Sequence, residues 1–225
     1  MKALEIEFHC HSIYSKDSLS PLRALVDTAR RARLDRLIIT DHNSIGGALE
    51  AQRIAPDLVI IGEEIMTTRG ELLAAFVKEE IPSGLEPADA IARLRAQGAF
   101  ISVSHPFDMF RNGHWEHSDL LQIAPLVDAI EVFNARCIDN RPNLAALEFA
   151  RLHDLAGTVG SDAHTLRELG RARLRLAEFE DSEGLKRVIR SGLQETRLSS
   201  PFIHLTSRYA VWMKQLGFVK RPEKK

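Results

Sequence analysis

Short apolar runs alternate with amphipathic, helix-like segments along this chain, and this alternation limits the possible folds more than any other feature. Continuous apolar runs are typical of buried parallel strands. The segments between them can act as crossovers, so the pattern predicts an α/β protein with a parallel sheet. About seven such units fit in 225 residues, which predicts a distorted (β/α)7 barrel, with an open doubly wound sheet as the alternative.

The expected elements cover the whole chain, and we expect one domain over residues 1–225. The expected strands are 4–8, 37–40, 58–61, 72–77, 100–103, 129–133 and 158–160. Ser20 and Pro21 are expected to open a helix as N-cap and first helical residue, and Ser182 to cap a late helix. An amphipathic helix and a basic tail are expected from about residue 201.

The first expected strand leads into His9 and His11. Residues two apart on a strand point to the same face, so both imidazoles can reach one ion. This motif is a weak signal alone, but it gains weight because later expected strands also end in metal-ligating or amide side chains. These are His42, Glu64, His105, Asn134, Asp162 and His164.

In βα barrels, sites lie at the carboxyl ends of the strands, so we expect these side chains to meet at one rim. Imidazole and carboxylate ligands suit Zn, Mn or Fe. Eight candidate ligands exceed what one ion needs and predict two or three divalent ions: His9, His11, Asp17, His42, Glu64, His105, Asp162 and His164. Glu63 is the alternative to Glu64, and Asp41 is expected to orient an imidazole.

Four spaced motifs resemble the PHP (polymerase and histidinol phosphatase) family of metal-dependent phosphoesterases. They are His9-Cys10-His11 with Ser15 and Asp17, Thr40-Asp41-His42-Asn43, Gly62-Glu63-Glu64 with His105-Pro106, and Ser161-Asp162-Ala163-His164. The resemblance implies a distorted barrel of about seven strands. It also implies three metal positions, held by His9, His11, Glu64 and Asp162, by Glu64 and His105, and by Asp17, His42 and His164.

Two positions depart from the trinuclear members of that family. Asp17 stands where those members carry histidine, a replacement also found in the family, and Asn134 stands in place of another histidine. Because an amide oxygen is a weaker ligand than imidazole, the second metal is expected to be held less firmly.

Arginine binds phosphate with two parallel hydrogen bonds, so basic residues near the strand ends are candidates for substrate binding. Arg111 and Arg136, with Asn134 beside them, are the expected substrate-binding residues, and Arg69 and Lys78 are weaker candidates. No catalytic side chain is expected beyond the metal-bound water.

Composition narrows the expected partners and location. The net charge of −1 argues against bulk electrostatic attraction to nucleic acid or membranes. No apolar run approaches the length of a membrane span, and Cys10 and Cys137 do not form a disulfide framework. We therefore expect a cytoplasmic protein without membrane attachment, for which nucleic acid is an unlikely partner.

These observations predict hydrolysis of a small phosphate ester, either a phosphomonoester or a nucleotide, by a metal-bound hydroxide at a di- or trinuclear site. An amidohydrolase-type metallohydrolase is one alternative, although that group usually carries a lysine between its metals and no lysine ends an expected strand here. A metal-stabilised module without catalysis is the other alternative. The sequence identifies neither the general acid nor the oligomeric state.

Overall fold

The computed structural model describes residues 3–220, and one nine-stranded sheet runs through that part of the chain. Its strands are β1 (Ala3–Cys10), β2 (Arg36–Ile39), β3 (Val59–Met66), β4 (Glu71–Ala75), β5 (Phe100–Val103), β6 (Ala129–Asn134), β7 (Ala156–Gly160), β8 (Ala172–Ala177) and β9 (Leu193–Thr196). The helices are α1 (Leu22–Arg31), α2 (Gly46–Ile54), α3 (Pro87–Ala96), α4 (His117–Ile123), α5 (Arg141–Leu152), α6 (Ser182–Val188) and α7 (Ile203–Gln215), with 3-10 turns at Ala124–Leu126 and Ile189–Ser191.

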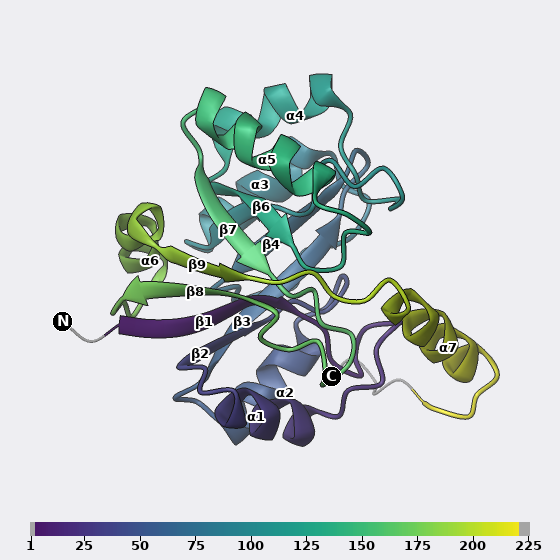
Figure 1. Cartoon of the computed structure of the whole chain (residues 1–225). Helices are drawn as coiled ribbons and strands as arrows, with labels where there is room; N and C mark the ends of the chain where they lie inside the picture. Colours follow the sequence, from purple (N-terminus) through teal and green to yellow (C-terminus); the bar gives the residue numbers. More distant parts are fainter. Residues whose placement is uncertain (1–2, 221–225) are drawn as a thin grey trace.

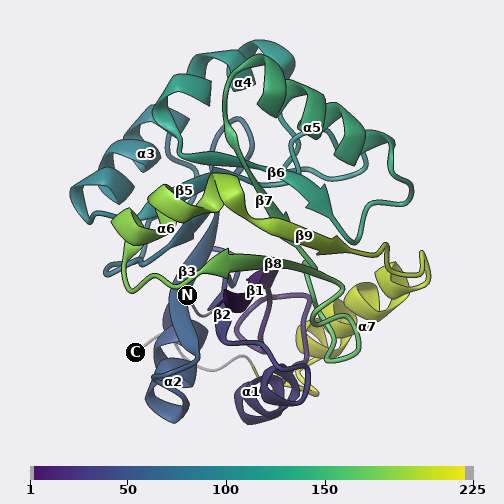
Figure 2. The ribbon, with the colours of Figure 1, turned by 60° about the vertical axis from the view of Figure 1, so that its left-hand side comes forward.

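The sheet curls into a nearly closed barrel. Its strand order is β7-β6-β5-β4-β3-β2-β1-β8-β9, and β7 returns to β1, where the amide of His11 donates to the carbonyl of Ala163 at 2.9 Å. Helices α3, α4 and α5 cover one outer side of the barrel, while α1 and α2 cover the opposite side (Figures 1 and 2). This arrangement confirms the expected distorted α/β barrel and brings many strand ends to one rim.

The expectation of a parallel sheet is wrong for two strands, β4 and β8. Strand β4 runs antiparallel to both β3 and β5, and β8 runs antiparallel to β1 and β9. Strands β3 and β4 are joined by residues 67–70, a connection far too short for a parallel crossover. Strands β8 and β9 were missed because they lack continuous apolar runs: β8 alternates buried and partly exposed residues, and β9 is exposed throughout.

The expected helix α1 forms, with Leu22, Leu25, Val26 and Ala29 buried on one face. Two cap predictions are wrong. The N-cap of α1 is Pro21 and not Ser20, and α6 is capped by Asp181, whose side chain accepts from the amide of Gly184 at 2.7 Å. Ser182 instead donates its hydroxyl to the carbonyl of Gly98.

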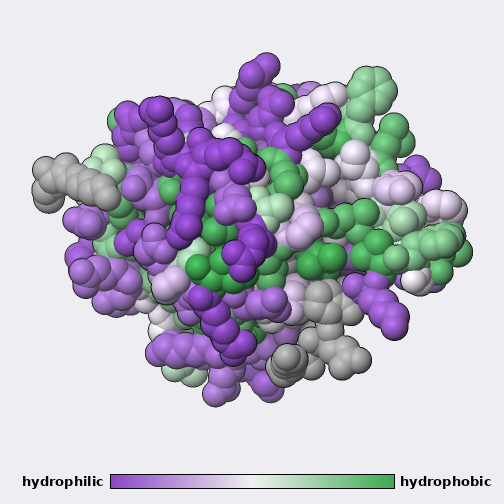
Figure 3. Space-filling model, turned by 90° about the horizontal axis from the view of Figure 1, so that it is seen from below, coloured by the Kyte–Doolittle hydropathy of each residue, from purple (hydrophilic) through white to green (hydrophobic). Residues whose placement is uncertain are grey.

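The expected C-terminal helix is present as α7, at one edge of the barrel (Figure 1). Within this helix only Ala210 is buried. Figure 3 shows hydrophobic surface on that side of the molecule. The large apolar and aromatic side chains exposed on and around α7 are Phe202, Leu205, Tyr209, Trp212, Leu216 and Phe218. Most of the expected basic tail, residues 221–225, lies outside the described residues. No helix in residues 3–220 has the length and apolar character needed to cross a membrane.

Candidate metal centre

The first group of candidate ligands lies where β1, β3 and β7 meet. Nε2 of His9 is 3.1 Å from Nε2 of His11 and 3.4 Å from Oε1 of Glu64. Oε2 of Glu64 is 3.4 Å from Nε2 of His11. Oδ1 of Asp162 completes the group, 3.2 Å from the His11 nitrogen and 3.6 Å from that of His9. These are the four residues that the resemblance assigned to one ion.

A second group lies on the other side of His11. Oδ2 of Asp17 is 3.4 Å from Nε2 of His42 and 3.2 Å from Nε2 of His164. The ring of His11 lies between the two histidines, with its centroid 4.5 Å from that of His42 and 4.1 Å from that of His164. The structure therefore brings together the three residues expected to hold a further ion.

The third group contains a residue that the sequence analysis missed. Nε2 of His105 is 3.1 Å from Oε1 of Glu64, as expected, but it also lies 3.4 Å from Oε2 of Glu71. The other oxygen of Glu71 is 3.6 Å from Nδ1 of His42. Glu71 is the first residue of β4, and because this strand is antiparallel, its beginning lies at the rim where the parallel strands end. Recognising 67–70 as a hairpin turn would have placed Glu71 there.

Glu64 occupies the centre of the cluster. Its Oε1 faces His9 and His105, and its Oε2 faces His11 and His42, with the Nδ1 of His42 at 3.0 Å. The hydroxyl of Ser104 donates to Oε1 at 2.7 Å. A carboxylate placed between two groups of imidazoles is suited to bridging two ions. Glu63 instead accepts a hydrogen bond from the amide of Ile81 at 3.0 Å.

The donor set fits divalent cations. Two buried carboxylate oxygens make no hydrogen bond of standard geometry although histidine ring nitrogens lie close to them, which is a costly arrangement for groups removed from water: Oε2 of Glu64 and Oδ1 of Asp162. His9 and His11 use Nδ1 to contact Glu131 and Ser15, which leaves Nε2 of each ring facing the same space. Nitrogen and oxygen donors that converge in this way match Zn, Mn or Fe.

Two candidate ligands have protonation states that suit metal binding, whereas nearby carboxylates raise the pKa of His9, His42 and His164 against the effect of burial. Burial, together with the neighbouring rings of His164 and His42, lowers the pKa of His11 to about 3, so this imidazole is neutral at pH 7. Although burial acts in the opposite direction, Arg111 and His9 hold the pKa of Asp162 well below its usual range. A neutral imidazole and an ionised carboxylate are the protonation states that coordinate a metal.

Glu131 supports the cluster from behind and was also missed. It is buried, its Oε1 lies 2.9 Å from Nδ1 of His9, and its Oε2 accepts from the amide of His105 at 2.9 Å. Carboxylates in this position orient a ligating imidazole and fix which nitrogen faces the metal. Its position within the apolar run of β6 was the available signal, because an acid at a buried strand position requires a polar partner.

Asp41, which was expected to orient an imidazole, contacts a serine that lies beside His11. Its Oδ1 accepts from the Ser15 hydroxyl at 2.7 Å and from the amide of Ser12 at 2.7 Å. The same Ser15 hydroxyl lies 3.0 Å from Nδ1 of His11. Asp41 therefore reaches His11 indirectly.

Arg111 lies at the open side of the cluster. Its guanidinium contacts the Asp162 carboxylate, donates to Asp108 at 3.1 Å and lies 3.4 Å from the side-chain oxygen of Asn134. Asn134 donates from Nδ2 to Asp162 at 3.1 Å and to Glu131 at 3.0 Å. Asn134 therefore holds Asp162 in place, and Arg111 is the expected phosphate-binding residue that faces the centre.

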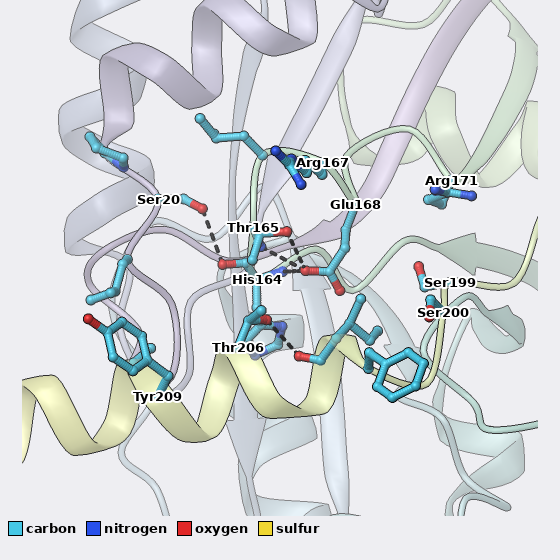
Figure 4. A pocket seen from close by; sticks show the side chains of 16 residues that line it. Ser20, His164, Thr165, Arg167, Glu168, Arg171, Ser199, Ser200, Thr206 and Tyr209 are labelled. Atoms are coloured by element: carbon cyan, nitrogen blue, oxygen red, sulfur yellow. Dashed lines mark hydrogen bonds between the residues drawn. The ribbon is translucent and has the colours of Figure 1, made fainter.

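Arg136 is placed differently. It is buried and donates to Oε1 of Glu168 at 2.6 Å and to the hydroxyl of Ser207 at 2.8 Å. Oε2 of Glu168 accepts from the amides of His164 and Thr165, at 3.3 and 2.9 Å (Figure 4). With two guanidinium nitrogens engaged, Arg136 is better placed to support the His164 loop than to bind a substrate.

Neither of the two weaker basic candidates forms an ion pair with a candidate ligand among the described residues. Lys78 follows the end of β4, which is opposite to the end that carries Glu71. Arg69 lies in the hairpin turn and pairs loosely with Glu86 at 3.8 Å.

Comparisons with known proteins agree with this geometry. Residues 7–130 match the PHP domain, and residues 140–193 match a PHP-associated region. An uncharacterized protein of Methanocaldococcus jannaschii is 37% identical over 179 residues, which cover 78% of this chain and 72% of that protein.

Two solved structures share the fold. A two-domain protein from Bacteroides vulgatus, which contains a predicted PHP-like metal-dependent phosphoesterase, superposes with a TM-score of 0.72 at 21% identity, over 87% of this chain and 65% of that one. A lesion-specific endonuclease from Pyrococcus furiosus superposes with a TM-score of 0.58 at 14% identity, over 86% and 57% of the two chains. These two likenesses concern the fold alone, and the match of residues 7–130 to the PHP domain shows that the chain belongs to the PHP domain family.

Proposed function

We propose that this protein is a phosphoesterase that hydrolyses a small phosphate ester at a di- or trinuclear metal site. The observation that carries the proposal is the convergence of side chains from separate strand ends around Glu64, with His9, His42 and His105 each within 3.4 Å of its carboxylate. The surplus of ligands over what one ion needs supports more than one ion.

The residues divide between holding the ions and binding the phosphate. Divalent ions, when bound, activate water and stabilise the phosphate oxygens of an in-line displacement. His9, His11, Glu64 and Asp162 would hold one ion, while Glu71 joins His105 and Glu64 at the second, where Asn134 replaces a histidine. Asp17, His42 and His164 would hold the third. Arg111 would bind non-bridging phosphate oxygens and orient the ester.

Exposure at the site favours a small or terminal phosphate. The side chains of Asp17, His42 and Arg111 are 18%, 13% and 19% exposed, whereas those of His9 and Asp162 are fully buried. A phosphoryl group from solvent would therefore meet these partly exposed side chains first. The net charge of −1 adds no general attraction for a polyanion.

The test uses metal-stripped protein, to which Mn, Zn or Fe is returned one at a time. The panel contains phosphomonoesters, nucleotides, an oligonucleotide, and amide and lactone substrates. We expect release of phosphate from small esters that a chelator abolishes and metal restores. His9→Ala and Asp162→Ala should abolish turnover, while His153→Ala, which changes an exposed histidine, should not.

Other outcomes would select the alternatives. Turnover of amides or lactones alone would favour an amidohydrolase, and cleavage of the oligonucleotide alone would favour a nuclease. Tight metal binding with no turnover of any substrate would favour a metal-stabilised module without catalysis.

A further inference from the structure

One lysine of α7 reaches across to the loop that carries Asp17. The ammonium group of Lys214 donates to the backbone carbonyls of Ile13, Ser15 and Ser18, at 2.7, 2.5 and 2.6 Å. A lysine ammonium has three hydrogens to donate, and each of these carbonyls can take one. The three carbonyls lie on both sides of Asp17, so one cation ties the two halves of this loop together.

Asp17 depends on its loop more than the other candidate ligands do. His9 and Glu64 lie within strands, and His42, His105 and His164 follow strands closely, whereas Asp17 lies seven residues beyond the end of β1. Carbonyl dipoles that point at one place repel one another unless a cation lies between them. Lys214 therefore supports the loop conformation in which Asp17 reaches His42 and His164.

Polar contacts hold α7 against the barrel. Besides Lys214, Ser207 accepts from Arg136, and Nε2 of His204 lies 3.1 Å from the Arg136 carbonyl. A cavity of about 650 Å³ separates part of α7 from the loop 164–168 (Figure 4). Because that space lacks packed side chains, the docking of α7 relies on these few anchors.

We propose that Lys214 is a positioning residue of the metal centre, which sets the affinity for the ion held by Asp17, His42 and His164. The inference rests on the proposed metal site and adds a part that the family comparison does not supply. Helix α7 lies outside both matched ranges, 7–130 and 140–193. The C-terminal helix would thus fix the position of the Asp17 loop, which the barrel alone holds less firmly.

The test compares Lys214→Met, Lys214→Arg and the control Arg208→Met, which changes an exposed cation on the same helix. Each protein is stripped of metal and titrated with Mn²⁺, and bound ions are counted after equilibrium dialysis. We expect Lys214→Met to weaken about tenfold the one ion that Asp17→Asn also weakens, and to leave the other ions unchanged. Lys214→Arg should recover part of the affinity, and Arg208→Met should match the wild type.

A double-mutant cycle shows whether Lys214 acts through Asp17. Asp17→Asn should weaken the same ion, and adding Lys214→Met to it should cause no further loss. Trypsin gives a readout without metal: Lys16 is exposed in the same loop, and cleavage after it should become faster in Lys214→Met. Ser18 also donates to the carbonyls of His11 and His164, at 3.1 and 2.9 Å, so the loop keeps a second attachment and the protein should remain folded.

Two results would overturn the inference. One is that Lys214→Met binds Mn²⁺ with wild-type affinities. The other is that Lys214→Met lowers the Mn²⁺ affinity equally in the wild-type protein and in Asp17→Asn. Either could occur in a protein that still hydrolyses phosphate esters, so the proposed function would survive. Conversely, a wild-type protein that binds Mn²⁺ but turns over no ester would refute the proposed function and still allow this test.

Discussion

Arg111 and Asp162 are paired at the open side of the candidate metal centre, and the two oxygens of the Asp162 carboxylate have different partners. Oδ2 of Asp162 contacts the Arg111 guanidinium, while Oδ1 faces the nitrogens of His9 and His11. The arginine is therefore held beside the candidate ligands but keeps 19% of its side chain exposed. This is the position from which a cation can reach both the metal centre and an incoming anion.

Removing this cation should weaken phosphate binding more than it weakens metal binding. Hydrogen bonds to charged groups contribute about 1.5–3 kcal/mol, so we expect Arg111→Ala to raise KM roughly 10- to 100-fold. Arg111→Lys should recover part of this loss, since it keeps the charge but not the planar fork. The inhibition constant of inorganic phosphate provides the check, with bound metal measured in parallel. An unchanged inhibition constant would remove Arg111 from substrate binding.

Glu71 should contribute to metal affinity although it was not among the residues expected from the sequence. Its carboxylate lies 3.4 Å from His105 and 3.6 Å from His42. We expect Glu71→Gln to weaken one ion about tenfold, because an amide is a poorer ligand than a carboxylate. Glu79→Gln, at an exposed site just beyond β4, is the control. Equal Mn²⁺ affinities in the two variants would show that Glu71 is not a ligand.

Metal removal should destabilise the fold, because the buried carboxylates lose the cations that balance them. A ligand at 100 times its Kd stabilises the folded state by about 2.7 kcal/mol per site. For a chain of this size, that corresponds to a Tm change of roughly 5–10 °C per ion. Calorimetry with chelator, and then with each metal returned, measures the shift. A Tm that is indifferent to chelator would contradict the assignment of these residues as ligands.

Glu7 should make stability fall as the pH rises toward neutrality. Burial raises its pKa to about 7, against a usual value of 4.5, despite hydrogen bonds from Ser161, Gly170 and His9. The folded chain keeps this proton after the unfolded chain has lost it, so folding is favoured fully below pH 4.5 and progressively less up to pH 7. The loss amounts to about 3 kcal/mol at 1.36 kcal/mol per pH unit.

Glu7→Gln removes this titration and isolates its effect. The variant also loses an acceptor, which shifts its stability by a constant amount. We expect the stability difference between Glu7→Gln and wild type to move by about 3 kcal/mol in favour of the variant between pH 4.5 and 7. Urea unfolding in the presence of chelator measures it without interference from metal binding. A difference that stays constant across this range would show that Glu7 is ionised throughout.

The recurring pattern of apolar runs ending in candidate ligands was sufficient to predict the barrel and the convergence of these side chains at one rim. Each of these ligands follows a strand or a short loop, and parallel strands bring their carboxyl ends to one rim. The local sequence pattern was therefore enough to predict that four histidines distant in sequence lie close together: His9, His42, His105 and His164. Asp41 also lies at this rim, where it accepts from Ser12 and Ser15, and its role in orienting an imidazole stays a prediction.

Other features depended on pairings that have no local signature. Strand direction decided the role of Glu71, because only an antiparallel β4 brings its first residue to the rim. Arg136 donates to Glu168 and Ser207, which are distant from it in sequence. These contacts do not support its expected role in phosphate binding. Lys214 reaches the Asp17 loop across about 200 residues of chain. The sequence alone determined which chemical groups gather at the strand ends, since that follows from local periodicity. Tertiary structure decided which groups orient and support them, since those contacts exist only once the barrel has closed.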